Sequence, residues 1–338
     1  MKKTYFITII MISNIMLLIL FPEISKCGVA KGITISANVI IPSLFPFMVC
    51  VLMLMKNYNN SKNVLTNKSK IYYVFLLSIL GGYPVGASLI NELYTQKTIN
   101  AKTADIMQSF CVNAGPAFIV IVVGNALGSK KLGIILLISH IIVSCIILGF
   151  SIKKLNLTTQ KNNQNELTSL SKSLTNAVSN TCDNLIKICS FIVLFSVINS
   201  YLDYFLAKTP ILKYIPFFTE VTYAVMNCKN IYLLSFLLGF AGISIWFQII
   251  SISEGRKINM LNFILSRIAH GTLSAVLTFL LLKIFKIKVS VFSNNVSFKK
   301  EFYISNLTLF ISMTIMLIVF FISTFCKNNS RKFMPDML

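Results

Sequence analysis

Two short stretches place glycine and proline inside or beside apolar runs, where a membrane helix would favour neither. They are Gly82-Tyr83-Pro84 and Asn113-Ala114-Gly115-Pro116. Proline removes a backbone donor and glycine adds conformational freedom. A helix that restarts at Pro84 or at Pro116 would present free N–H groups and the positive end of its dipole, which suits a carboxylate or a phosphate. A simple packing kink is the alternative interpretation of both stretches.

Polar side chains also interrupt later apolar runs. Arg267 and His270 are three residues apart and therefore share one face of a helix. An arginine within a membrane span normally faces a cavity or a partner, and it could hold a carboxylate through two hydrogen bonds. The alternative is that Arg267 lies near the membrane surface and snorkels. Gln248 could contact a substrate or bridge two helices.

An acidic segment, Glu220-Val221-Thr222, lies next to another expected helix break. Its carboxylate could take a proton or bind a cation, or it could pair with a lysine at the interface. No nucleophile–base arrangement, phosphate loop or metal-ligand spacing occurs, so we predict no enzyme and no cofactor. The candidate substrate-binding residues are Gly82, Tyr83, Pro84, Asn113, Gly115, Pro116, Glu220, Thr222, Gln248, Arg267 and His270.

The elements that must position these residues are membrane helices. Of 338 residues, 55% are hydrophobic and 12% are charged, about half the charged fraction of an average soluble domain. The apolar residues come in long runs, so we predict an all-α polytopic integral membrane protein with about 8–10 membrane segments, including broken or re-entrant helices. The net charge of +21 fits an anionic substrate or anionic lipids, or reflects only lysine-rich loops. No soluble segment is long enough for a basic domain, so a nucleic-acid partner is not expected.

The runs predict a single membrane domain over 1–338. We expect a first half at 35–152, a polar linker at 153–180, a second half at 181–286 and a C-terminal span at 303–326. Before the first half, residues 4–21 predict an uncleaved first span. Within the first half, the paired prolines Pro42 and Pro46 predict a kinked start to the span at 35–55.

The two halves share a short pattern. His140-x-x-x-Ser144 and His270-x-x-x-Ser274 contain the chain's two histidines, and an Ala-Gly pair precedes each, at Ala114-Gly115 and Ala241-Gly242. Repeated membrane halves with discontinuous helices at matching positions are typical of transporters. We therefore predict a two-fold internal repeat.

The order of these elements resembles a known family. Gly82-Tyr83-Pro84-Val85-Gly86-Ala87, Asn113-Ala114-Gly115-Pro116, Glu220-Val221-Thr222 and Arg267-x-x-His270 occur in the order seen in sporulation integral membrane proteins of the YlbJ type. Those proteins belong to the wider nucleoside-recognition, or gate-domain, group. The resemblance covers residues 35–286.

This resemblance implies a carrier of dipicolinic acid across the outer forespore membrane of an endospore-forming bacterium. Dipicolinate is a small planar dianion, which two helix N-termini and an arginine could bind. The expected partners are therefore a small anion and membrane lipids. The alternatives are a non-transporting scaffold for assembly of the spore envelope and a nucleoside transporter.

Overall fold

The computed structural model describes residues 2–60, 67–155, 170–206, 208–209, 212–253 and 255–287. Every regular element in these ranges is a helix, and all of them belong to one compact unit, Met1–Ser293. The C-terminal span expected at 303–326 lies outside the described residues. Five helical segments are long and apolar enough to cross a membrane: Pro22–Met55, Lys130–Lys154, Lys172–Leu206, Ile231–Ile252 and Met260–Ile284. The prediction of an all-α fold is thus confirmed for the described residues, and the five apolar helices of spanning length support its membrane character. Ser69–Gly81 adds a shorter apolar helix.

The N-terminal part consists of α1 (Lys2–Leu20) followed by a long continuous helix made of α2 (Pro22–Ile35), η1 (Ser36–Ile40) and α3 (Ile41–Asn60). The π-helical turn η1 lies directly before Pro42, whose ring would clash with a regular turn. The Ser43 hydroxyl donates to the carbonyl oxygens of Val39 and Ile40, at 2.5 and 3.2 Å. The predicted irregularity near Pro42 is therefore present, although the candidate span extends back to Pro22 rather than beginning at 35.

The expected linker is partly helical. Helix α8 (Lys130–Ser151) continues into η3 (Ile152–Lys154), and α9 (Leu170–Leu206) already begins at Leu170. Ser173, Ala177 and Thr181 recur every four residues along α9 and are all buried, which is the spacing of one helix face. This stripe of small residues explains why 170–180 is helix rather than linker.

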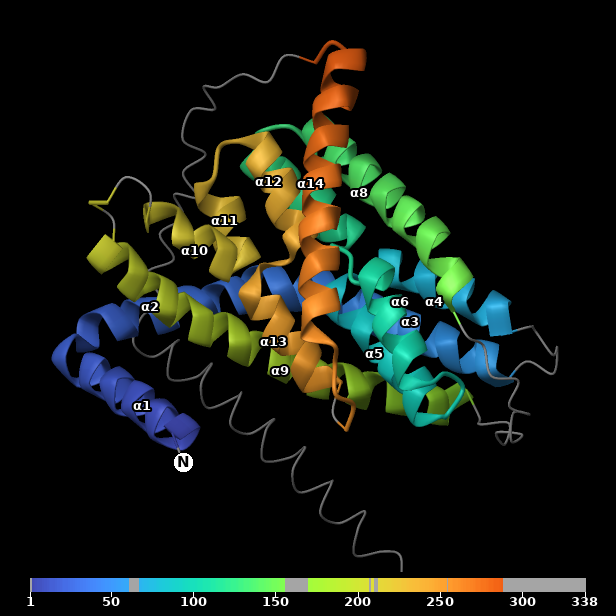
Figure 1. Cartoon of the computed structure of the whole chain (residues 1–338), viewed down its shortest axis with the longest axis horizontal. Helices are drawn as coiled ribbons and strands as arrows, with labels where there is room; N and C mark the ends of the chain where they lie inside the picture. Colours follow the sequence, from blue (N-terminus) through green and yellow to red (C-terminus); the bar gives the residue numbers. More distant parts are fainter. Residues whose placement is uncertain are drawn as a thin grey trace, which may run out of the picture. The chain divides into compact units, whose positions relative to one another are not determined.

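Helices α2 and α9 pack very closely. A Cβ added at Gly28 or at Gly32 would lie 2.6 Å from the Cα of Val197 or Val193 respectively. Glycine four residues apart is the usual means by which membrane helices approach at backbone distance. Figure 1 shows α9 running beside α2.

The remaining helices are short pieces and one long helix, α14. The first group is α4 (Asn67–Gly81), α5 (Tyr83–Thr95), α6 (Ala101–Cys111), η2 (Phe118–Val123) and α7 (Gly124–Ala126). The second is η4 (Leu212–Tyr214), α10 (Ile215–Thr219), α11 (Val221–Asn227), α12 (Ile231–Phe240), α13 (Gly242–Ile252) and α14 (Met260–Ile284). Helix α14 packs against both α12 and α8 (Figure 1).

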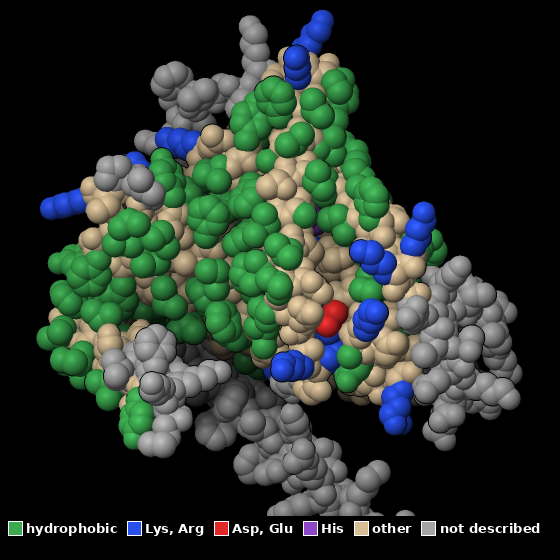
Figure 2. All heavy atoms as spheres, in the orientation of Figure 1, with side chains coloured by type: hydrophobic (Ala, Val, Ile, Leu, Met, Phe, Trp, Pro, Cys, Tyr) green, Lys and Arg blue, Asp and Glu red, His purple; other side chains and the backbone are tan. Residues whose placement is uncertain are grey.

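The face drawn in Figure 2 separates apolar from charged side chains. Figure 2 shows apolar side chains covering the middle of the visible face, with Lys and Arg side chains near its edges. Large exposed apolar residues include Leu273, Val276 and Phe279 of α14. Apolar side chains exposed along a span are normal where the surrounding solvent is lipid.

Candidate functional site

The first feature of the site is a crossing of two irregular segments in the first half of the chain. Gly82 separates α4 from α5 with φ 87° and ψ −175°, and residues 112–115 separate α6 from the helical turn that begins at Pro116. A Cβ added at Gly82 would lie 3.2 Å from the backbone nitrogen of Gly115, and one at Gly115 would lie 3.4 Å from the Cα of Gly82. Glycine at both positions therefore allows the two chain segments to touch. We call this contact the first crossing.

A second crossing occurs in the second half. Glu220 separates α10 from α11, and Ala241, at φ 69°, separates α12 from α13. Gly242 has φ 57°, and a Cβ added there would lie 3.2 Å from the backbone nitrogen of Val221. A non-glycine residue in the left-handed region, such as Ala241, is uncommon and is held there by its surroundings.

The starts of the two short helices differ in how they are capped. Glu220 caps α11, since its Oε2 accepts a hydrogen bond of 2.6 Å from the backbone N–H of Tyr223. At α5 the capping position is Gly82, which has no side chain, and Pro84 lies in the first turn. One helix start therefore receives a carboxylate from the chain itself, while the other keeps its positive dipole end uncompensated by a side chain.

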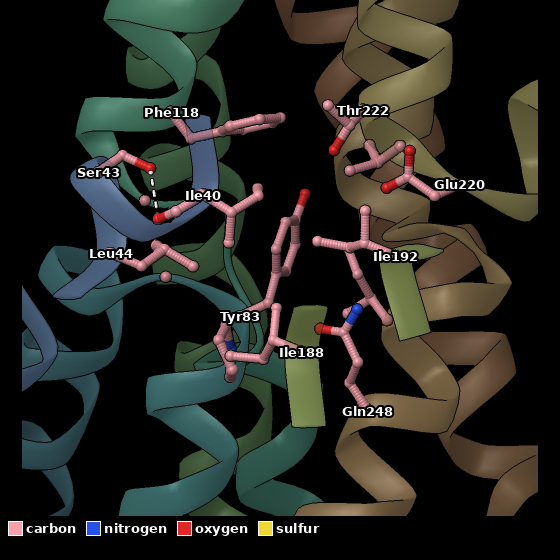
Figure 3. Close-up of a pocket in the computed structure, with 15 residues that line it drawn as sticks. Ile40, Ser43, Leu44, Tyr83, Phe118, Ile188, Ile192, Glu220, Thr222 and Gln248 are labelled. Carbon is pink, nitrogen blue, oxygen red and sulfur yellow. Dashed lines mark hydrogen bonds between the residues drawn. The ribbon is translucent and has the colours of Figure 1, made fainter. Parts of the chain in front are cut away.

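A cavity of about 50 Å³ lies between the two crossings, which holds a few water molecules and is smaller than the roughly 300–1,000 Å³ of typical small-molecule sites. Its walls come from both crossings and from the long helices α3 and α9. Figure 3 shows the Tyr83 ring standing in the cavity, with Phe118 on one side and Ile192 and Thr222 on the other. The Tyr83 hydroxyl donates a 2.6 Å hydrogen bond to the carbonyl oxygen of Leu238, which fixes this ring across the two halves.

The lining is mostly apolar with few polar groups. Glu220 is the only acidic or basic residue of the lining, and Ser43, Thr222 and Gln248 supply neutral polar side chains. Glu220 is 2% exposed, and no lysine or arginine within the described ranges forms a salt bridge with it. Of the two alternatives for Glu220, the ion pair with a lysine is therefore not found among the described residues.

Seven of the eleven candidate residues line this cavity, although they come from distant parts of the chain. They are Gly82, Tyr83, Pro84, Gly115, Glu220, Thr222 and Gln248. The other four lie outside the lining: Asn113, Pro116, Arg267 and His270.

Asn113 supports the first crossing instead of facing the cavity. Its Nδ2 donates to the carbonyl oxygen of Phe110 at 2.7 Å, and its Oδ1 accepts from the Ser144 hydroxyl at 2.6 Å. Pro116 follows Gly115 directly and begins the next helical turn. Asn113 and Pro116 therefore shape the helix break and do not form part of the cavity wall.

Arg267 occupies neither of the positions expected for it. It is completely buried, and its two terminal nitrogens donate to the carbonyl oxygens of Val112 and Ser109. These carbonyls belong to the end of α6, where helix carbonyls lack intrahelical partners and the dipole is negative. The structure therefore corrects both expectations: Arg267 caps a helix end, so it neither faces the cavity nor snorkels to the membrane surface.

His270 faces the chain's other histidine. The Nε2 atom of His270 lies 3.0 Å from Nδ1 of His140, and both rings are buried between α14 and α8. Hydrogen bonds also join Thr278 of α14 to Ser139 of α8 and Ser235 of α12, at 2.9 and 2.8 Å. His270 thus belongs to a polar contact between helices and not to the cavity.

Sequence reasoning missed the contributions of the long helices. Ser43, Ile188 and Ile192 line the cavity from α3 and α9. Ser43 lies between Pro42 and Pro46 and carried a weak signal, whereas Ile188 and Ile192 resemble any other apolar residue of a span.

In the described part of the chain, no group of three or more His, Cys, Asp or Glu side chains could hold a metal ion.

Comparison of the chain with protein-family models, with curated proteins and with solved structures finds no match.

Proposed function

We propose that this protein is a membrane transporter whose substrate passes through the cavity between the two crossings. The observation that carries the proposal is the meeting of two crossings, each made of two interrupted helix pairs, around one cavity, among helices long and apolar enough to span a membrane. In a bilayer, non-helical backbone is tolerated only where protein or water surrounds it. A buried, water-filled chamber is the simplest reason for a membrane protein to keep both crossings.

In this proposal the two crossings belong to a two-fold repeat. Each half contributes a long helix, two interrupted helix pairs and a straight span with the His-x-x-x-Ser pattern. Two observations support this: each crossing contains a glycine with positive φ, at Gly82 and Gly242, and His140 and His270 contact each other. The three interrupted pairs that lie outside the five long spans, together with α1 and the expected C-terminal span, would then bring the chain to about 8–10 membrane segments.

The first substrate candidate is a small organic anion, dipicolinate, carried across the outer forespore membrane as the YlbJ-type resemblance implies. The uncapped start of α5 at Gly82 favours negative charge in the cavity. The Glu220 carboxylate opposes it, so a bound anion would require a proton or a cation on Glu220. Proton- or cation-coupled uptake is therefore part of this candidate.

A nucleoside is the second candidate, and the same carboxylate favours it. Glu220, Thr222 and Gln248 offer hydrogen-bond donors and acceptors, while Tyr83 and Phe118 offer aromatic faces for a planar base. A neutral solute meets no repulsion from Glu220.

Uptake into vesicles tests the proposal. The purified chain would be reconstituted, and entry of radiolabelled dipicolinate and of uridine would be compared with entry into protein-free vesicles. We expect one of the two solutes to enter faster with protein present. Entry of neither above the protein-free rate would contradict the proposal and favour the non-transporting scaffold.

A further inference from the structure

A second buried arginine lies away from the cavity, in the connection between α13 and α14. The side chain of Arg256 is 1% exposed, and its Nη1 forms an ion pair with Asp105 of α6. The carboxylate of Asp105 also receives the backbone N–H of Asn259, at 3.4 Å. This ion pair uses one of the three guanidinium nitrogens, so Nε and Nη2 need other partners.

The remaining nitrogens of Arg256 have no partner among the described atoms. Both Nε and Nη2 are buried and unbonded. In a planar guanidinium these two nitrogens lie on the same edge and direct two parallel N–H groups outward. That edge matches the two oxygens of a carboxylate.

The surrounding side chains have unpaired atoms as well. Asn91 of α5 donates through Nδ2 to the carbonyl oxygen of Ile252 at 2.9 Å, and Gln108 of α6 donates through Nε2 to the Ser253 hydroxyl at 3.3 Å. The other amide atoms, Oδ1 of Asn91 and Oε1 of Gln108, are buried without a partner among the described residues. Buried polar groups in native proteins are nearly always bonded, and each that is not costs about 1–3 kcal/mol.

These four buried polar atoms, which lack partners in the described part of the chain, thus belong to three residues that lie in, or bond to, the end of α13 and the connection after it, a place we call the junction. The Tyr94 ring adds an aromatic wall, 5.9 Å from Cζ of Arg256. Lys102 and Lys257 are exposed close by in the sequence, and Figure 2 shows Lys and Arg side chains around an acidic one over α5 and α6. Positive charge around the entrance attracts anions.

We propose that this junction is a binding site for a carboxylate, held by Nε and Nη2 of Arg256. The amide oxygens of Asn91 and Gln108 accept hydrogen bonds from donor groups of the same ligand or from water held with it. Arg267, with its terminal nitrogens on the carbonyls of α6, offers no such edge. Arg256 thus takes the role that the sequence suggested for Arg267, at a different place.

The position of the junction relates it to the cavity. Asn91 lies seven residues beyond Pro84 on α5, about 10 Å along the helix axis. Ser253 follows Gln248 by five residues at the end of α13. The junction therefore lies at one end of two helices that also line the cavity, where a soluble anion would be held before entry or after release.

Isothermal titration calorimetry with dipicolinate as the probe tests the site, because it counts bound molecules per chain. The full chain in detergent would be compared with Arg256→Lys, which keeps the charge for Asp105 but lacks the two-donor edge. We expect the variant to bind one dipicolinate fewer per chain than the native protein. The expected difference is the same whether or not the protein is a transporter. If dipicolinate does not bind in the cavity, the number bound per chain falls from one to zero. If dipicolinate also binds in the cavity, the number falls from two to one.

Two controls keep the result interpretable. Lys257→Ala removes a neighbouring exposed charge and should leave the count unchanged. Gln108→Glu supplies a carboxylate from the chain itself, and we expect it to remove the same binding event and raise the unfolding temperature. Equal counts for the native chain, Arg256→Lys and Gln108→Glu would overturn the proposal.

Discussion

The two crossings solve the same backbone problem with different chemistry. In the first, the later of the two interruptions covers residues 112–115, and the carbonyls of Ser109 and Val112 at the end of α6 are bound by the charged side chain of Arg267. In the second, the later interruption is the single residue Ala241. There the indole N–H of Trp246 donates to the carbonyl oxygen of Phe240 at 2.9 Å. A longer break frees more carbonyls and is capped by a charged side chain with several donors, whereas a one-residue break is capped by a neutral one.

A further difference concerns the cavity between them. The first crossing directs an uncapped helix start toward it, and the second directs the Glu220 carboxylate toward it. The cavity therefore has a helix N-terminus on one wall and a carboxyl group on the other. Under the proposed transport function, this asymmetric chamber would bind an anion together with a cation or proton, or a neutral solute that meets separated donors and acceptors.

The largest expected effect comes from removing the charged cap. Arg267→Ala should lower the free energy of unfolding by about 3 kcal/mol, because two hydrogen bonds from a charged donor are worth about 1.5 kcal/mol each. The matched change at the second crossing, Trp246→Phe, removes one neutral hydrogen bond and should cost about 1 kcal/mol. Unfolding followed by circular dichroism in detergent measures both. Equal losses would show that the two crossings are capped equivalently.

Substitution of the glycines at the crossings should cause the next largest losses in the free energy of unfolding. Gly82→Ala forces a side chain into a backbone region that essentially only glycine adopts, and it should cost about 2 kcal/mol. Gly242→Ala needs only the left-handed region and should cost about 1 kcal/mol. The same unfolding assay compares them, with Gly149→Ala as a control, since a Cβ there would contact nothing within 4 Å. A larger loss at Gly242 than at Gly82 would contradict this ranking.

The smallest expected change in the free energy of unfolding concerns the serines of the two His-x-x-x-Ser patterns. Ser144 donates to Asn113, whereas the Ser274 hydroxyl is buried with no partner among the described residues. Ser144→Ala should therefore cost about 1 kcal/mol, and Ser274→Ala should be neutral or slightly stabilising. A comparable loss in both would mean that Ser274 has a partner after all.

The helical membrane class was predictable from the long apolar runs, and the positions of the first crossing from glycine and proline, which are costly inside a membrane helix. The pairing of the crossings around one cavity was only partly predictable. The glycine-proline and Glu-x-Thr patterns indicated which residues would line it, but the isoleucines of α9 carried no signal. The role of Arg267 could not be derived, because its partner carbonyls lie 155 and 158 residues away in the sequence. A buried arginine needs a partner, and only the packing of α14 against α6 showed which one.

Thiol accessibility in a bilayer tests the central claim most directly. Thr222→Cys places a thiol on the cavity wall, and Thr278→Cys places one among packed helices, where Thr278 is completely buried. The reconstituted variants would be treated with 2-aminoethyl methanethiosulfonate, and modification above the level of the native protein would be followed by mass spectrometry. We predict that the cysteine at 222 is modified and that the cysteine at 278 is not. Absence of modification at 222, or equal modification at both positions, would mean that the crossings enclose no water-accessible chamber.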